Sequence, residues 1–183
     1  GGTLIVEIIS RFYNQIVNAG GEIIQTEGDS ITFFFDTSDE KNNLNKIISL
    51  IQKLNLALEE QHKLNAQKFG TDYPSGIYMR VAVEKGSIKP IWQNFEGRDV
   101  AGWLQGSNSS VFVDVARLLE AESKLGNKSE STIVLSNEKN QLDGLANQFI
   151  NLKTHKDEVV IKHGRKINVT VLSLNCNMNH GRN

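Results

Sequence analysis

The chain has 183 residues, enough for one domain with a sizeable core and too few for two of ordinary size. Its formal net charge is −1, and its lysines and arginines are scattered, so composition gives no case for binding nucleic acid or an anionic membrane. The single cysteine, Cys176, excludes an intramolecular disulfide and is compatible with a reducing cytosol. No apolar run reaches the roughly 20 residues of a membrane span, so we expect a cytoplasmic protein or a cytoplasmic domain of a membrane-anchored parent.

The N-terminal part predicts a helix followed by two strands. Apolar residues recur at helical spacing from residue 4 to residue 18, and Gly20-Gly21 should end this helix. Glu22–Thr26 and Ser30–Phe35 then have the composition of short strands. Because the second strand carries three consecutive phenylalanines, we expect it to be central in its sheet and buried on both faces.

The turn between these strands carries the first candidate site residue. Gly28 suits a backbone position with positive φ, which would hold Asp29 at the tip of a tight hairpin. A carboxylate fixed there is well placed to bind a metal ion. An Asx-type turn residue without any ligand is the alternative interpretation of the turn taken alone.

The next elements follow from the same patterns. A long amphipathic helix is predicted from Leu44 to about Leu64, with one side packed on a sheet. Ile77–Val83 alternates and should form a strand, with Ser87–Trp92 as its antiparallel partner. Gln93–Ser107 is predicted to be a loop, and loops of this length are more often functional than idle.

The C-terminal part completes an α+β pattern. A helix should span Val111 to about Leu125, a strand Thr132–Leu135, and a further helix capped by Ser136 should run through Phe149. Glu158–Lys162 and Ile167–Leu174 should form a closing hairpin. The order of elements predicts an α+β sandwich with one mostly antiparallel sheet and helices packed on it.

Five short motifs occur in an order that identifies a family resemblance. They are Gly20-Gly21-Glu22, Gln25-Thr26-Glu27-Gly28-Asp29, Arg80–Ile88, Val113–Glu120 and Ile161-Lys162-His163-Gly164. In this order they resemble the motifs of the class III adenylate and guanylate cyclase catalytic domain, the cyclase homology domain. The resemblance implies a single domain over residues 1–174 with a ferredoxin-like α/β sandwich of the nucleotide cyclase type, and we expect a disordered tail at residues 175–183.

The resemblance also implies a chemistry. In this family two aspartates hold two metal ions, which position the triphosphate and activate the ribose 3′-hydroxyl for attack on the α-phosphate. Asp29 matches the second aspartate, so the implied cofactor is Mg²⁺ or Mn²⁺ in a two-metal site of which only Asp29 is identifiable. The strand that carries the first aspartate is missing, and we expect it upstream of this sequence or from elsewhere.

Further positions are matched to substrate binding by the resemblance. Gln25 stands where the family has a base-recognising lysine, and an amide can still hydrogen-bond a purine edge. Gly28 keeps the glycine before the metal-binding aspartate. Lys162 could hold phosphate oxygens, and a solvated surface lysine on a hairpin is the alternative.

The helix that carries the family's V-N-x-A-x-R-L-E motif can be aligned in two ways. If Arg117 is the arginine that stabilises transition-state charge, Val113 replaces the asparagine that orients the ribose. If Leu119-Glu120 matches the family's Leu-Glu, Asp114 replaces the asparagine and Leu118 replaces the arginine. Either alignment loses a catalytic group, and removing one such donor typically costs about 10²–10³ in rate.

Two functions are therefore carried forward. The first is a divergent cyclase homology domain in a signalling protein, with an incomplete catalytic set, which binds ATP or GTP or serves as a dimerisation module. The alternative is an active cyclase, a phosphorus–oxygen lyase that forms cAMP or cGMP and pyrophosphate by two-metal catalysis, either alone or with a complementing partner chain. Both imply a homodimer or a heterodimer with another cyclase-type domain. A third possibility is a likeness in fold only.

Overall fold

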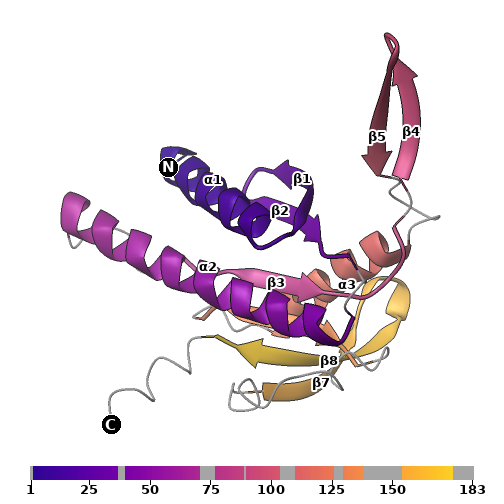
Figure 1. The fold of residues 1–183 in the computed structure, drawn as a ribbon. Coiled ribbons are helices and arrows are strands. Elements are labelled where there is room, and N and C mark those ends of the chain that lie inside the picture. Colours follow the sequence, from indigo (N-terminus) through magenta and orange to yellow (C-terminus); the bar gives the residue numbers. More distant parts are fainter. Residues whose placement is uncertain are drawn as a thin grey trace. The chain divides into compact units, whose positions relative to one another are not determined.

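Figure 1 shows a computed structural model of the chain, which describes residues 2–36, 40–70, 77–88, 90–103, 110–125, 130–137 and 154–174. The chain divides into two compact units. We call the described residues up to Met79 unit 1 and those from Arg80 onward unit 2.

Unit 1 is built from two helices and a β-hairpin. Helix α1 spans Gly2–Asn18 and helix α2 spans Glu40–Phe69. Strands β1 (Glu22–Glu27) and β2 (Ser30–Phe34) pair antiparallel, which confirms both predicted strands. Helix α2 extends beyond the predicted range at both ends because its polar flanks contain no glycine or proline before Gly70.

The core of unit 1 lies where α1 meets α2. Its buried residues recur at helical spacing on each helix: Ile8, Phe12 and Ile16 on α1, and Leu50, Leu54, Ala57 and Leu58 on α2. Ile23 of β1 and Ile31 and Phe33 of β2 pack against this core from the hairpin. Burial of apolar side chains on one face of each element therefore fixes the hairpin that carries Asp29.

The turn from α1 into β1 depends on two glycines with different roles. Gly20 has a φ of +94°, a left-handed conformation that favours glycine, and its N–H donates to the Val17 carbonyl at 3.0 Å. A Cβ on Gly21 would lie 2.8 Å from Cγ2 of Ile16, so close packing excludes a side chain there. The predicted glycine cap is confirmed, and it sets the point where β1 begins.

The phenylalanine-rich strand differs from its prediction. Strand β2 is only partly buried, and within the described residues it pairs with β1 alone. Phe33 and Phe35 face the core of unit 1 and form an edge-to-face ring pair with centroids 6.1 Å apart. The expectation of burial on both faces is wrong, because the run of phenylalanines spans both faces of the strand while the core covers only one.

Unit 2 contains a four-stranded sheet covered by one helix. Strands β3 (Arg80–Val83), β6 (Thr132–Ser136), β8 (Lys166–Ser173) and β7 (Thr154–Val160) lie in that order. The β3–β6 pair is parallel, and the other two pairs are antiparallel. Helix α3 (Ser110–Leu125) packs on this sheet through Leu118, Ala121 and their neighbours. The predicted α+β class is confirmed, with a sheet that is mixed rather than strictly antiparallel.

The pairing predicted around β3 is wrong. Strand β4 (Pro90–Phe95) does not pair with β3 but with β5 (Arg98–Trp103), across a tight turn at Glu96-Gly97 where both residues have positive φ. The predicted loop is therefore a β-hairpin over its described residues. Strand β3 instead finds β6, a parallel neighbour that requires a long crossover connection, and α3 lies within that connection.

The closing hairpin is confirmed with one refinement. Strands β7 and β8 pair antiparallel, and the short 3-10 turn η3 (Lys162–Gly164) joins them. His163 and Gly164 both have positive φ, which lets the chain reverse there. The helix predicted from Ser136 to Phe149 and the tail 175–183 lie outside the described residues.

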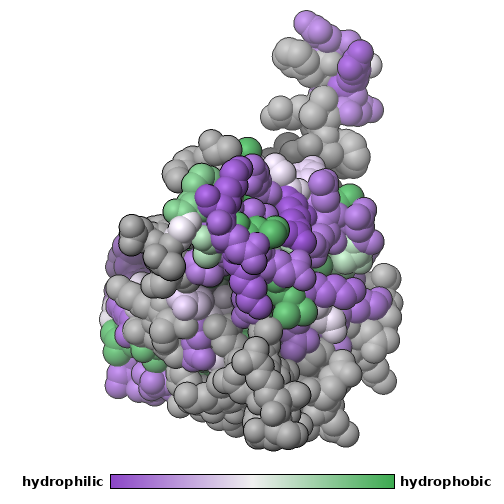
Figure 2. Space-filling model, turned by 90° about the vertical axis from the view of Figure 1, so that its left-hand side faces the viewer, coloured by the Kyte–Doolittle hydropathy of each residue, from purple (hydrophilic) through white to green (hydrophobic). Residues whose placement is uncertain are grey.

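The surface of the described parts is mixed in polarity. On the face drawn in Figure 2, hydrophilic residues predominate and the hydrophobic areas are small and separate. Among the described residues, no helix combines the length and the apolar character needed to cross a membrane.

Candidate functional site

The tip of the β1–β2 hairpin in unit 1 holds three of the predicted site residues. Gly28 has a φ of +56°, as the turn prediction required, and Asp29 follows it as an exposed turn residue. The Ser30 hydroxyl donates to the Glu27 carbonyl at 2.9 Å and closes the turn. Gln25 lies exposed on β1 after a register shift between Ile23 and Gln25. The hairpin therefore presents a carboxylate at its tip, and an amide on its exposed strand end.

The donor set at this tip does not fit a two-metal centre. Among the described residues, no three His, Cys, Asp or Glu side chains gather closely enough to hold a metal ion. Asp29 offers one exposed carboxylate, with Glu27 two residues before it. The described side chains therefore supply at most part of the expected Mg²⁺ or Mn²⁺ site, and no metal-dependent step follows from them.

The remaining predicted site residues belong to unit 2, where Glu120 connects two of them. Nη1 of Arg117 lies 3.4 Å from Oε2 of Glu120 on the same face of α3. The backbone N–H of Lys162 donates to Oε1 of Glu120 at 3.1 Å. Nζ of Lys124 lies 3.6 Å from that same oxygen. One carboxylate thus receives the Arg117 guanidinium, the Lys124 ammonium and the backbone of the β7–β8 connection.

Lys124 strengthens this junction from the same helix. Its ammonium donates to the Val160 carbonyl at the end of β7, over a distance of 2.8 Å. Glu120 and Lys124 therefore fasten the η3 connection to α3, and they bring the Lys162 backbone to the turn of helix that carries Arg117. The Lys162 side chain itself is exposed. We call Arg117, Glu120, Lys124 and the Lys162 backbone the Glu120 cluster.

Comparison with known proteins supports the fold. No family model and no curated protein matches this chain. The adenylyl cyclase CyaB from P. aeruginosa matches over 93% of this chain and 80% of its own, with a TM-score of 0.63 and 15% identity. The guanylyl cyclase Cya2 matches over 94% and 81%, with a TM-score of 0.61 and 16% identity. The guanylate cyclase domain of RhGC from Catenaria anguillulae, solved in complex with GTP, matches over 92% of this chain and 80% of its own, with a TM-score of 0.53 and 9% identity.

The chain has the nucleotide cyclase fold. At these identities the likeness shows the fold and nothing finer, so the chemistry of this cyclase fold has to be argued from its own residues.

Within this cyclase fold, burial separates the two alignments of the α3 motif. Leu118 is 2% exposed and belongs to the core of unit 2, so the position cannot present a group to a ligand. Val113 is 41% exposed and lies one helical turn before Arg117, whose side chain is 27% exposed. Asp114 follows the first turn of α3 and is partly buried. The pair of Val113 and Arg117 is thus the accessible one.

The sequence reasoning assigned no role to two acidic residues of α3, Glu120 and Glu122. Glu120 stands three residues after Arg117 and four before Lys124, a spacing that places all three side chains on one helix face and could have indicated the cluster. Glu122 stands four residues after Leu118 and three before Leu125, on the apolar stripe of the helix. An acid at such a position signals a buried carboxyl group.

Glu122 is that buried group, with an exposed fraction of 6%. Its Oε1 accepts a hydrogen bond from the Thr132 hydroxyl on β6, whereas Oε2 has no hydrogen-bond partner among the described residues. Burial of the carboxyl raises the pKa of Glu122 from 4.5 to about 7, and the Thr132 hydrogen bond and the positive charge of Arg80 lower it in part. The Glu122 carboxyl therefore becomes negatively charged near neutral pH, at the buried contact between α3 and Thr132 of β6.

Proposed function

We propose that this chain is a non-catalytic member of the nucleotide cyclase fold, a nucleotide-binding or dimerisation module that does not form cyclic nucleotide by itself. The observation that carries this proposal is the Glu120 cluster. Arg117 is the only candidate in the α3 motif for stabilising transition-state charge, and its guanidinium is already paired with Glu120. A cation held by a carboxylate offers little charge to a developing phosphate anion.

The exposed face of α3 supports the same conclusion. Val113 occupies the position that the family resemblance assigns to a ribose-orienting asparagine, and its side chain carries no hydrogen-bonding group. The alternative alignment would put Leu118 in the role of the arginine, and Leu118 is buried in the core. Of the two groups that the family resemblance assigns to the transition state, the asparagine is thus replaced by Val113 and the arginine, Arg117, is paired with Glu120.

The residues of unit 1 remain compatible with binding of ATP or GTP. The exposed Asp29 carboxylate can hold one Mg²⁺ or Mn²⁺ ion that arrives with a triphosphate, and the Gln25 amide can hydrogen-bond a purine edge. For pairing of two such domains, α3 offers Val113 and Leu119, which are both exposed apolar residues. We accordingly propose a homodimer or a heterodimer with another cyclase-type domain, acting in cytoplasmic signalling.

A binding titration tests this function. Fluorescent ATP and GTP analogues are titrated with Mn²⁺ into the wild type, Asp29→Ala and the matched control Asp157→Ala, which removes an exposed acid from β7 of unit 2. We expect saturable binding that Asp29→Ala weakens about tenfold or more, as loss of a metal-binding carboxylate does. Equal binding by all three proteins, or none by any of them, would contradict nucleotide binding through Asp29.

Dimerisation is tested separately by sedimentation of the wild type, with Val113→Lys as the disrupting variant. A monomer at all concentrations and with either nucleotide would remove the dimerisation half of the proposal. The alternative function, an active cyclase completed by a partner chain, is favoured by the accessible Asp29 and requires product formation that Asp29→Ala abolishes.

A further inference from the structure

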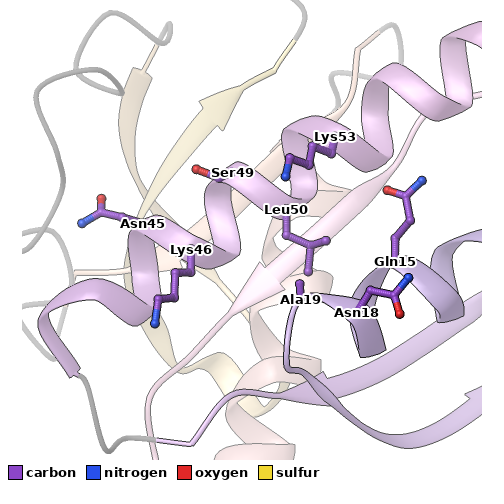
Figure 3. A pocket seen from close by; sticks show the side chains of 8 residues that line it. All are labelled: Gln15, Asn18, Ala19, Asn45, Lys46, Ser49, Leu50 and Lys53. Atoms are coloured by element: carbon purple, nitrogen blue, oxygen red, sulfur yellow. The ribbon is translucent and has the colours of Figure 1, made fainter.

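The two units differ in how polar side chains meet their interiors. In unit 1, a hollow of about 730 Å³ lies between α1 and the first half of α2, and of the eight side chains that line it only Leu50 is buried (Figure 3). In unit 2, by contrast, Glu122 of α3 is buried, and among the described residues it is the only acidic or basic side chain that is. One of its oxygens lacks a hydrogen-bond partner there, which is costly in an interior, so the groups within its reach decide its role.

Three elements meet at this carboxyl group. Oε1 of Glu122 accepts a hydrogen bond from the Thr132 hydroxyl of β6, and Oε2 is the oxygen without a partner among the described residues. Thr132 is the register partner of Arg80 on β3, so both side chains lie on the same face of the sheet. Ala82, two residues after Arg80, packs against the core that contains Leu118 of α3. Because side chains alternate along a strand, Arg80 therefore lies on the face of the sheet that α3 covers.

Arg80 has the charge and the shape that this oxygen needs. Its side chain is exposed and makes no hydrogen bond or ion pair with the other described residues. Burial raises the pKa of Glu122, and the positive charge of Arg80 acts in the opposite direction. A guanidinium is a planar fork of N–H donors that matches a carboxylate, and it is more weakly hydrated than an ammonium group. An arginine at this position is therefore suited to a carboxylate at the edge of an interior.

The other charged groups around α3 do not compete for Oε2. They have partners of their own: Lys124 with Glu120, Lys166 with Glu158, and the carboxyl group of Glu130 with the Ser173 hydroxyl. On β7, His155 and Asp157 share the face of Val159 by register, but β8 separates that strand from β6. Among the described residues, Arg80 is thus the cation that faces Glu122.

We propose that Glu122 is a proton-operated latch between α3 and β3. In the neutral acid, the proton is on Oε2 and the carboxyl group holds β6 alone, through Thr132. When the proton leaves to solvent, Oε2 accepts hydrogen bonds from the Arg80 guanidinium, which offsets part of the cost of the buried charge. Because α3 lies in the crossover from β3 to β6, the closed latch joins the helix to both strands that the crossover connects. The latch depends neither on nucleotide binding nor on dimerisation.

The pKa of Glu122 reports the contact with Arg80 directly. It is measured from the side-chain ¹³Cδ shift in the labelled full chain, between pH 5 and pH 9. We expect Arg80→Gln to raise this pKa by about 0.5 or more, because it removes the cation that stabilises the charged form. Arg80→Lys keeps the charge without the fork and should recover part of the difference. Arg98→Gln, which removes an exposed arginine from β5, is the matched control and should leave the pKa unchanged. Superimposable titrations of the wild type and Arg80→Gln would overturn the proposal.

A double-mutant cycle shows whether the contact forms only with the ionised acid. The wild type, Arg80→Gln, Glu122→Gln and the double variant are unfolded in urea at pH 5.5 and at pH 8.5. Glu122→Gln preserves the side chain's shape and an acceptor for the Thr132 hydroxyl, so we expect all four proteins to fold. The coupling between the two positions should change the unfolding equilibrium constant by less than about twofold at pH 5.5 and by about fivefold or more at pH 8.5. A coupling of equal size at both pH values, or none at pH 8.5, would contradict a latch operated by the Glu122 proton.

Discussion

The hairpin tip of unit 1 and the α3 face of unit 2 hold the two halves of the predicted site, and they are organised in opposite ways. Asp29 is exposed on a turn that backbone and hydroxyl contacts close without using its carboxylate. Arg117 lies in a cluster where Glu120 holds a guanidinium, an ammonium and a backbone N–H.

The difference shows what a shared fold leaves open. A carboxylate at a tight turn is positioned by local geometry alone, so its placement needs no support from other elements of the fold. A cation aimed at a reacting phosphate must be held in place without being neutralised, which demands support from several elements. In this chain the supporting carboxylate takes the charge of Arg117 and ties α3 to the β7–β8 connection instead.

The largest effect is expected where α3 meets its sheet. Leu118→Ala removes a side chain that is 2% exposed and should lower the free energy of unfolding by about 3 kcal/mol, from lost burial and the cavity left behind. The adjacent Leu119→Ala, at 39% exposed, is the control and should change it by less than about 1 kcal/mol. Urea unfolding at pH 6 measures both, and equal losses would mean that α3 is not anchored as described.

The next effect comes from Glu122. Its folded pKa of about 7 lies above the unfolded value of 4.5, so its contribution to stability is present in full below pH 4.5 and is lost as pH rises through 7. Between pH 5 and pH 8 the wild type should lose about 2–3 kcal/mol of unfolding free energy relative to Glu122→Gln. Parallel urea titrations check this, and two superimposable pH profiles would show that Glu122 is not buried as a neutral acid.

On the hairpin side, the packing at Gly21 is the sensitive point. Gly21→Ala would place a Cβ 2.8 Å from Cγ2 of Ile16 and 3.1 Å from its carbonyl oxygen, so we expect a loss of about 2 kcal/mol. Gly20→Ala meets no atom within 4 Å but adopts a φ of +94°, and its loss should be nearer 1 kcal/mol. Thermal unfolding ranks the two, and the reverse ranking would contradict the packing assigned to Gly21.

The smallest effect on stability is expected within the Glu120 cluster. Glu120→Gln removes two ion pairs of partly exposed groups but keeps an acceptor for the Lys162 N–H, so it should cost less than about 1 kcal/mol. The cost should disappear in 1 M salt. Glu158→Gln, whose partner Lys166 is 3.7 Å away and largely exposed, is the control. If Glu120→Gln lowers the free energy of unfolding by more than about 1 kcal/mol, Glu120 stabilises the fold by more than its two ion pairs.

Short-range features of the fold could be predicted from the sequence, because adjacent residues determine them. The apolar spacing of α1, the glycine cap at Gly20 and the positive φ of Gly28 follow from local patterns. The parallel pairing of β3 with β6 could not be predicted in this way, since the residues that pair across the two strands lie about 50 positions apart in the sequence. Within the Glu120 cluster, the helical spacing of Arg117, Glu120 and Lys124 is visible in the sequence, whereas the bond from the Lys162 backbone to Glu120 could not be predicted because it joins residues 42 positions apart.

The central claim is that the engaged Arg117 and the apolar Val113 leave this chain without cyclase activity. Cyclic nucleotide formation from ATP and from GTP, each with Mn²⁺, tests it most directly when the wild type, Asp29→Ala and the double variant Val113→Asn with Glu120→Gln are assayed together. We predict no product from the wild type or from Asp29→Ala. Product from the wild type that Asp29→Ala abolishes would contradict the claim and establish an active cyclase.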